Sequence, residues 1–158
     1  MTMNMFKITI LAVGKIKNKA IAELINNYTK RLSHLAKLDI VELPAVSFSD
    51  SSQAKAKQSE GQAILAWLAK QTGAEVWLLD ERGKNLTSTD LAASLTKSSA
   101  KVIMVVGGAL GLAEEVKQKI KFHLALSKMT LPHELARLIL LEQIYRAATI
   151  SQGIDYHY

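Results

Sequence analysis

Short apolar segments alternate with segments of helical periodicity along the whole chain, and this alternation is the strongest constraint on the fold. The apolar segments, each typical of a buried strand, are residues 6–13, 38–43, 75–79, 101–106 and 122–126. Apolar residues at helical spacing are found between and after them, in residues 18–34, 53–71, 88–97, 113–120 and 133–152. Strands that alternate with helices in this way favour an α/β fold, in which a mostly parallel sheet has helices on both faces.

The length of 158 residues suggests one domain over residues 1–158, with residues 1–5 outside the fold and residues 154–158 as a tail. The serine-rich stretch at 45–52 predicts a mobile loop, and the polar run at 80–85 predicts a turn that closes the third strand. Ser88 or Thr89 is expected to cap the helix that follows.

The composition excludes several kinds of site. Cysteine is absent, which excludes disulfides, thiolate zinc sites and a cysteine nucleophile. No stretch approaches the roughly 20 apolar residues of a transmembrane helix, and the amino terminus lacks the pattern of a signal peptide, so we expect a cytoplasmic protein. The net charge of +6 and the pI near 9.5 favour a polyanionic partner such as nucleic acid over ordinary solubility charge.

The last predicted helix is unusual because apolar side chains lie nearly all round its axis. These residues are Leu135, Leu138, Ile139, Leu140, Leu141, Ile144, Tyr145, Ala147, Ala148 and Ile150. A helix of this kind must be buried on all sides, whereas a sheet covers only one side of it. We therefore expect a homodimer that packs partly through this helix. The alternative is a monomer in which the helix is sunk in the core.

Two loops at the carboxyl ends of buried strands are the expected place for a ligand. The first begins with Gly107 and Gly108, but it matches neither the G-x-x-x-x-G-K-[ST] nor the G-x-G-x-x-G spacing of phosphate-binding loops. Glu114 and Glu115, which follow it, suit the first turn of a helix better than a pyrophosphate. The glycines form either a plain tight turn or a close backbone approach to a ligand. The second loop, in the segment 126–133, either lines an apolar pocket or packs in the core.

Three charged residues of the last helix are candidates for a site. Glu142 and Arg146 are four residues apart with the acid first, which is the favoured spacing of a helical ion pair. Arg137 lies among apolar neighbours, so it needs a partner or a ligand.

The histidines and the tail are less specific signals. His133, at the start of the last helix, is either a hydrogen-bonding residue of a helix terminus or a catalyst. His34 and His123 have no ligand-like spacing, and we expect no metal. The aromatic tail at 154–158 either frays or closes a site.

Several motifs, in order along the chain, resemble those of the RlmH-type methyltransferases of the SPOUT class. They are KITILAVGK (Lys7–Lys15), DxxGK (Asp80–Lys84), VVGGxxGL (Val105–Leu112), LSxMTLPH (Leu126–His133), EQxYRA (Glu142–Ala147) and a terminal YH. The resemblance covers essentially the whole chain. It implies a deep trefoil knot near the carboxyl end, a homodimer and S-adenosylmethionine as the methyl donor. It also implies methylation of N3 of a pseudouridine in 23S ribosomal RNA.

The resemblance places the donor between three loops. Its donor-binding positions correspond here to Leu79, Gly107, Leu126, Ser127, Lys128, Met129, Thr130 and Leu131. The reacting N3 is a weakly acidic imide nitrogen, so an enzyme must align it with the methyl group and can supply a base. The candidate bases are His133, Glu142 and His157, and the sequence does not choose among them. The candidate RNA contacts are Lys84, Arg146 and Tyr156, and we expect the tail to reach across the dimer.

The chain departs from the resemblance in two places. Tyr158 stands where the family usually ends in a basic residue, and Glu81 and Arg82 stand where apolar residues or proline are common. Three other functions stay open: a SPOUT enzyme acting on another RNA such as tRNA, a non-catalytic ribosome- or RNA-binding module, and a flavodoxin-like nucleotide binder. The intact GG turn and LSxMTLPH loop count against the non-catalytic module, and the apolar LSxMTLPH loop and the all-round apolar last helix count against the flavodoxin-like binder. Because the domain is small, we expect a large assembled target such as the ribosome.

Overall fold

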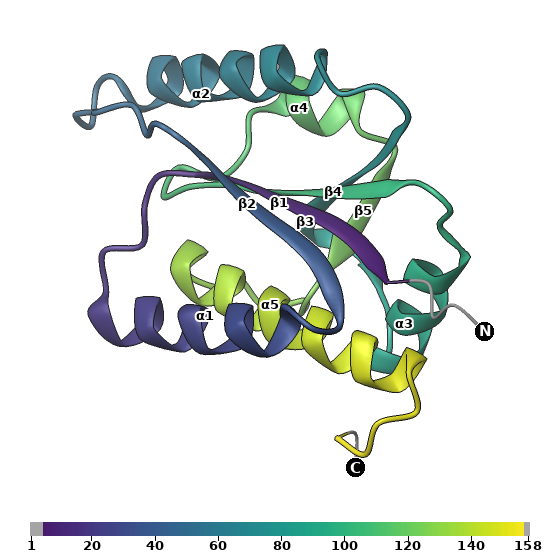
Figure 1. The fold of residues 1–158 in the computed structure, drawn as a ribbon. Coiled ribbons are helices and arrows are strands. Elements are labelled where there is room, and N and C mark those ends of the chain that lie inside the picture. The colour runs from purple at the N-terminus through teal and green to yellow at the C-terminus, as the bar shows by residue number, and fades with distance from the viewer. Residues whose placement is uncertain (1–4, 157–158) are drawn as a thin grey trace.

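The computed structural model of the protein describes residues 5–156 and confirms the alternation of strands and helices (Figure 1). The elements are β1 (Phe6–Val13), α1 (Lys19–Leu32), β2 (Ala36–Leu43), α2 (Gln53–Leu68), β3 (Ala74–Asn85), α3 (Ser88–Lys97), β4 (Lys101–Val106), α4 (Glu114–Lys119), β5 (Phe122–Ala125) and α5 (His133–Ser151). The expected cap of α3 is wrong by one residue. Thr87, rather than Ser88 or Thr89, accepts a hydrogen bond from the backbone N–H of Asp90.

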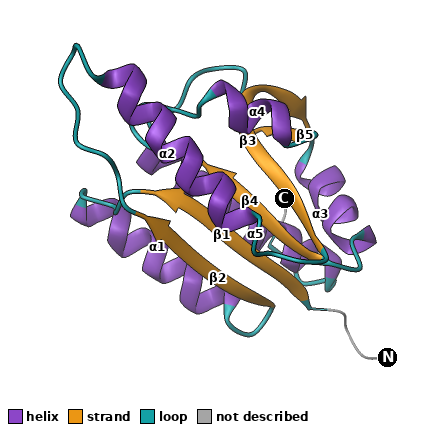
Figure 2. Cartoon of the chain, turned by 90° about the horizontal axis from the view of Figure 1, so that it is seen from above, coloured by secondary structure: helices purple, strands orange, loops and turns teal. Residues whose placement is uncertain are grey.

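The strands form one sheet in the order β2-β1-β4-β3-β5, and every neighbouring pair is parallel. Helices α2 and α4 cover one face, and α1, α3 and α5 cover the other (Figures 1 and 2). Side chains of β4 alternate between the two faces, with Met104 packed toward α1, α3 and α5 and Ile103 and Val105 toward α2 and α4. Because both faces are buried, the central strand β4 is continuously apolar from Val102 to Val106. The expected α/β fold with helices on both faces is confirmed.

The prediction for the end of the third strand is wrong. Residues 80–85, expected as a turn, continue β3, which reaches Asn85. Leu79 and Lys84 both pair with Leu124 of β5, so the residues between them bulge out of the ladder. Gly83 allows this path, because a Cβ at this position would lie 2.6 Å from the carbonyl carbon of His123. The polar sequence is typical of a turn, and only the presence of β5 alongside makes it a strand.

Helix α5 is buried mainly by its own chain. It lies between α1 and α3 beneath the sheet (Figure 1), and Leu140, Leu141 and Ile144 are fully buried there. Leu135, at its amino-terminal end, is 39% exposed. The apolar surface from which we inferred a homodimer is therefore largely covered within one chain, because two helices as well as the sheet pack against it. The homodimer itself stays a prediction.

The carboxyl-terminal third returns to the middle of the fold. Strand β5 lies at the edge of the sheet, and α5 then passes back beneath the sheet (Figure 2). The trefoil knot implied by the resemblance stays a prediction. Within residues 5–156, no helix has both the length and the apolar character needed to cross a membrane.

The serine-rich segment between β2 and α2 contains local hydrogen bonds. The hydroxyl of Ser52 accepts from the backbone N–H of Ser49 at 2.8 Å, and the carboxylate of Glu60 accepts from the backbone N–H of Val46 at 3.0 Å. The mobility that we expected for this segment stays a prediction.

Candidate functional site

A cavity of about 390 Å³ lies beside the bulge of β3 and at the carboxyl ends of β4 and β5. Segments from these three places line it, with contributions from α4 and from the first turn of α5. The residues from these segments are Leu79–Arg82, Val106–Leu112, Leu124, Leu126, Ser127 and Met129–Leu131; the helices add Lys117, His133 and Ala136. The cavity is where a parallel α/β sheet is expected to bind its ligand. Of the predicted donor-binding residues, Lys128 alone is not among its lining residues.

The turn after β4 forms one wall of the cavity. The backbone N–H of Gly111 donates to the carbonyl oxygen of Gly108 at 3.0 Å, and Gly111 has a φ of +74°, a conformation that favours glycine. A Cβ on Gly107 would lie 3.0 Å from the backbone of Gly111 and from the side chain of Leu112. The glycines therefore make the tight turn that is one of the two interpretations of the sequence. This turn also faces the cavity.

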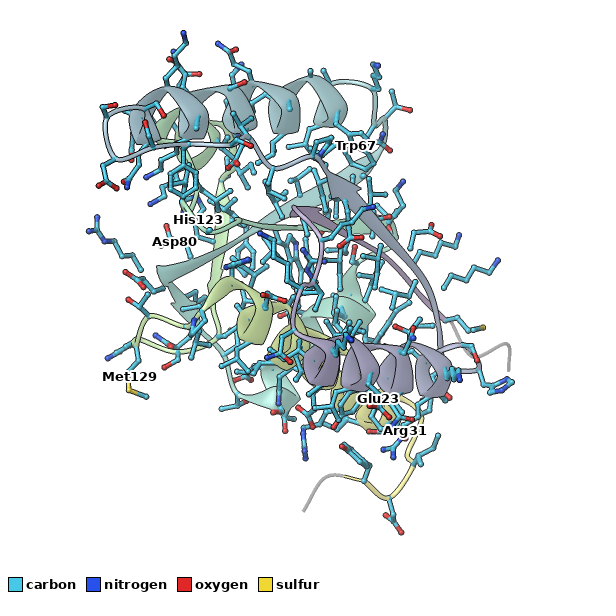
Figure 3. All side chains as sticks on the ribbon, turned by 90° about the vertical axis from the view of Figure 1, so that its left-hand side faces the viewer. Glu23, Arg31, Trp67, Asp80, His123 and Met129 are labelled. Atoms are coloured by element: carbon cyan, nitrogen blue, oxygen red, sulfur yellow. The ribbon has the colours of Figure 1, made fainter. Side chains whose placement is uncertain are left out.

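The loop before α5 forms another wall of the cavity. Its Ser127 hydroxyl accepts a hydrogen bond from the backbone N–H of Met129 at 3.0 Å, and the hydroxyl of Thr130 donates to the carboxylate of Glu81 at 2.5 Å. The second of these bonds joins the loop to the bulged part of β3. Met129 projects from the loop and is 74% exposed (Figure 3). An apolar side chain this exposed at a cavity mouth is available to a ligand or a partner.

The wall formed by β3 includes Asp80, whose pairing with His123 of β5 was not expected from the sequence. Asp80 lines the cavity and contacts the ring of His123, which lies behind it on β5 and is not a lining residue (Figure 3). Burial raises the pKa of the Asp80 carboxyl, but the backbone N–H of Arg82 and the charges of Lys117 and His123 outweigh it. The pKa therefore lies below its usual value, and Asp80 is ionised. The DxxGK motif contained the first signal, but we interpreted this aspartate only as part of a turn.

His133, the first residue of α5, faces the cavity, and its neighbour Glu134 ties α5 to the start of α1. The Glu134 carboxylate accepts hydrogen bonds from the backbone N–H groups of Lys17, at 2.7 Å, and of Asn18, at 3.1 Å. The Asn18 bond is the largest cause that holds the pKa of Glu134 below its usual value. This contact fixes the position of His133, since the two residues are adjacent on the first turn of the helix.

Arg137 finds partners for its two terminal guanidinium nitrogens, whereas its buried Nε has no hydrogen-bond partner among the described residues. Its side chain is ion-paired with Glu42 at the end of β2 and donates to the carbonyl oxygen of Gly14 at 2.9 Å. Arg137 is 2% exposed, whereas the side chain of Glu42 is 33% exposed. The arginine therefore joins the carboxyl ends of β1 and β2 to α5. This is a structural role, next to the cavity wall made by Ala136 and His133.

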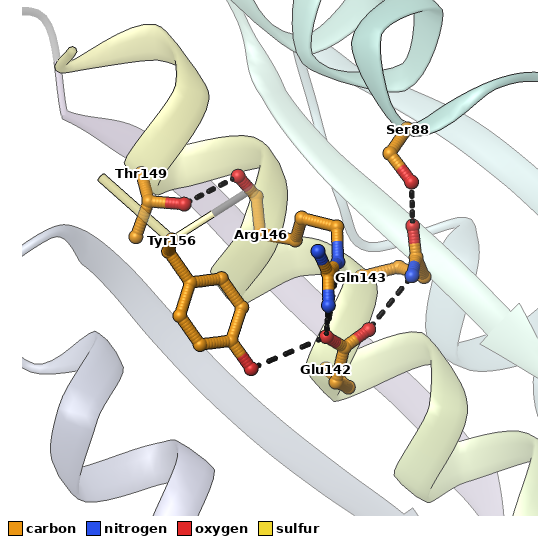
Figure 4. A network of polar contacts seen from close by, with 6 residues as sticks. All are labelled: Ser88, Glu142, Gln143, Arg146, Thr149 and Tyr156. Atoms are coloured by element: carbon orange, nitrogen blue, oxygen red, sulfur yellow. Dashed lines mark hydrogen bonds and ion pairs between the residues drawn. The ribbon is translucent and has the colours of Figure 1, made fainter. Parts of the chain in front are cut away.

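A second polar cluster lies further along α5, and it confirms the ion pair expected between Glu142 and Arg146 (Figure 4). The Glu142 carboxylate accepts from the Arg146 guanidinium at 2.7 and 3.1 Å and from the Tyr156 hydroxyl at 3.3 Å. Burial, with the neighbouring Tyr28 hydroxyl and the negative charge of Glu142, raises the pKa of Tyr156 to about 12. The side chain of Gln143 donates to Glu142 as well. The ion pair also raises the pKa of Arg146.

The two groups of candidate residues do not meet within one chain. His133 and Glu142 are nine residues apart on α5, which is about 13 Å at 1.5 Å per residue, and Glu142 and Arg146 do not line the cavity. Lys84 is exposed on β3 beyond the cavity lining. His157 lies outside the described residues. Within residues 5–156, no three His, Asp or Glu side chains are grouped closely enough to hold a metal ion.

Comparisons with known proteins place the chain among methyltransferases. A family model described as predicted SPOUT methyltransferase matches residues 6–157. A probable methylase family protein from Haemophilus influenzae Rd KW20 is 16% identical and aligns with a TM-score of 0.58 over 97% of this chain and 72% of that one. TrmJ from Z. mobilis ZM4 is 12% identical and aligns with a TM-score of 0.54 over 91% and 70% of the two chains. At such low identity, the two structures establish a shared fold.

Proposed function

Because this chain belongs to the SPOUT methyltransferase family, whose methyl donor is S-adenosylmethionine, we propose that it methylates N3 of a pseudouridine in the 23S RNA of the large ribosomal subunit. The observation that supports the proposal most directly is the cavity beside the bulge of β3 and at the carboxyl ends of β4 and β5. The loops that form it carry the motifs on which the resemblance to the RlmH-type enzymes depends.

The cavity fits the methyl donor in size and chemistry. Its volume of about 390 Å³ is within the usual range of small-molecule sites. Leu79, Val106 and Leu131 offer apolar surface for a purine ring, and the hydroxyl of Ser127 offers a hydrogen-bonding group for a ribose. The ionised Asp80 lies at the wall, where a negative charge favours the cationic sulfonium and ammonium groups of the donor.

The bound donor supplies an electrophilic methyl group on a sulfonium. The protein must hold the imide nitrogen of the uracil ring in line with that group and accept its proton. Of the three candidate bases we favour His133, because it lines the cavity. The carboxylate of Glu142 is already an acceptor for Arg146, Gln143 and Tyr156, so it is less available for proton transfer.

We place the target RNA across the cavity mouth of a homodimer in the cytoplasm. Met129 and Lys128 at the mouth are exposed, and the net charge of +6 favours a polyanion. Lys84, Arg146 and Tyr156 are our candidate RNA contacts. Because Arg146 and Tyr156 lie far from the cavity of their own chain, we propose that they act at the cavity of a second copy, together with the tail.

Two measurements test the proposal. Calorimetric titration of the purified protein with S-adenosylmethionine, with light scattering for its mass, should show micromolar binding by a dimer. The protein and donor are incubated separately with large ribosomal subunits, with free 23S RNA and with tRNA. Mass spectrometry of the digested RNA should then show a methylated pseudouridine in ribosomal RNA and none in tRNA. Methylation of tRNA alone would establish the alternative substrate. A well-folded dimer that binds no donor and methylates nothing would favour the non-catalytic module.

A further inference from the structure

The ring of His123 faces oxygen atoms on both of its nitrogens. Its Nδ1 lies 3.2 Å from Oδ2 of Asp80, and its Nε2 lies 3.0 Å from the carbonyl oxygen of Lys117 and 2.8 Å from that of Ile120. The carbonyl oxygens can only accept hydrogen bonds, and so can the carboxylate, because Asp80 is ionised.

This arrangement constrains the protonation of the ring. A neutral imidazole carries one N–H, so one of its nitrogens would present a lone pair to an oxygen atom. The doubly protonated ring donates on both sides and satisfies every contact. It also places a positive charge next to Asp80, which makes that hydrogen bond charge-assisted.

The ring connects two elements of the cavity wall. Asp80 belongs to the bulged part of β3, and its Oδ1 accepts the backbone N–H of Arg82 at 3.0 Å. Lys117 is in the last turn of α4 and also lines the cavity. The backbone of His123 supports the same part of β3, since it packs directly against Gly83. The side chain and the main chain of one residue thus hold the β3 wall in place.

We propose that His123 is a positioning residue whose doubly protonated ring holds Asp80, Glu81 and Arg82 in the shape that binds the methyl donor, so that donor binding weakens when the ring loses a proton. The charged groups that act on the Asp80–His123 pair are Asp80 itself from β3 and Lys117 from α4. The inference rests on the proposed function, because it takes the cavity as the donor site.

The test is donor titration by calorimetry between about pH 5 and about pH 8, the range in which an imidazole changes charge. The dissociation constant of the wild type should rise about tenfold with pH, the effect of losing one charge-assisted hydrogen bond. In Asp80→Asn the side-chain amide can turn its N–H toward Nδ1 and donate to the neutral ring. The dissociation constant of this variant should therefore not rise with pH, whatever its value at low pH. The exposed His34→Gln is the matched control and should keep the rise. His133→Gln removes the histidine that lines the cavity, so a pH dependence of donor binding that persists in this variant does not come from His133.

A second readout needs no ligand. The backbone N–H of Arg82 is protected only while Asp80 holds its position, so its hydrogen-exchange protection, corrected for the intrinsic effect of pH, should fall over the same range. Asp80→Asn should remove this fall as well. Donor binding that does not depend on pH, or Arg82 protection that stays constant, would overturn the inference about His123 and leave the proposed function standing. Absence of donor binding at every pH would instead refute the proposed function, and the Arg82 protection would still decide the role of His123.

Discussion

Gly83 on β3 packs directly against the main chain of His123 on β5, so closely that a Cβ at residue 83 would lie 2.6 Å from both the carbonyl carbon and the carbonyl oxygen of His123. The contacting atoms are backbone atoms of a paired strand, which cannot move aside as a flexible side chain can. The contact therefore decides whether β3 can follow β5 past the bulge at residues 80–83.

Gly83→Ala should lower the free energy of unfolding by about 2–4 kcal/mol, because the new methyl group forces β3 and β5 apart. Urea denaturation followed by circular dichroism measures the change. Gly73→Ala is the matched control: its φ of +68° strains the substitution, but no atom beyond its two neighbours in the chain lies within 4 Å of the new Cβ. The control should cost about 1 kcal/mol. Equal losses in the two variants would contradict the close contact at residue 83.

The pair of Arg137 and Glu42 should respond unequally to the loss of each partner. Glu42→Ala leaves a guanidinium that is 2% exposed without its counter-charge, and should cost about 3–5 kcal/mol of unfolding free energy. Arg137→Met leaves a carboxylate that is one-third exposed and can be hydrated, so it should cost about 1–2 kcal/mol less than Glu42→Ala. Chemical denaturation of both variants checks the order. A larger loss for Arg137→Met would show that its hydrogen bond to Gly14 matters more than the buried charge.

Glu134 should hold the start of α1 only in its ionised form. Its pKa is below the ordinary value, so its stabilising contribution is complete above about pH 4.5 and is lost as the pH falls through the folded-state pKa. Hydrogen exchange at the backbone N–H groups of Lys17 and Asn18 should accelerate below that pH, after correction for the intrinsic rate. Glu134→Ala should show the fast exchange at neutral pH, and the exposed Glu23→Ala on α1 should not.

Tyr156 should ionise later than an ordinary tyrosine. Its pKa is raised to about 12, so the neutral side chain contributes stability that is complete below about pH 10 and is lost as the pH rises through about 12. Absorbance titration near 295 nm, as the difference between the wild type and Tyr156→Phe, should give a midpoint near pH 12. A difference midpoint close to pH 10 would show that the phenol is not buried beside Glu142 in solution.

His133→Asn should reduce methylation of the ribosomal substrate by about 10²-fold or more if His133 accepts the proton, while donor affinity changes little. Single-turnover rates and donor titration on the same preparations separate the two effects. Glu142→Gln is the comparison, because it tests a candidate base that lies outside the cavity. A larger rate loss for Glu142→Gln than for His133→Asn would transfer the base role to Glu142 and favour a site completed by a second copy.

The sequence by itself determined the elements and the place of the site. Strand and helix segments are recognisable locally, because apolar spacing follows the period of each element. The loops that follow the fourth and fifth strands were expected to meet a ligand because ligands of parallel α/β sheets bind beyond the carboxyl ends of the strands. The resemblance, rather than this argument, assigned Gly107 and Leu126–Leu131 to the donor, and all of these except Lys128 line the cavity.

Only the tertiary structure decided how distant residues meet. The polar residues after Leu79 are typical of a turn, and they extend β3 only because β5 lies alongside. His123 has no sequence signal, since its partner Asp80 is 43 residues away. The apolar circumference of α5 indicated that the helix is buried, but not that α1 and α3 bury it. Periodicity records how much surface of an element must be covered, whereas the identity of the covering partner depends on packing between segments far apart in the chain.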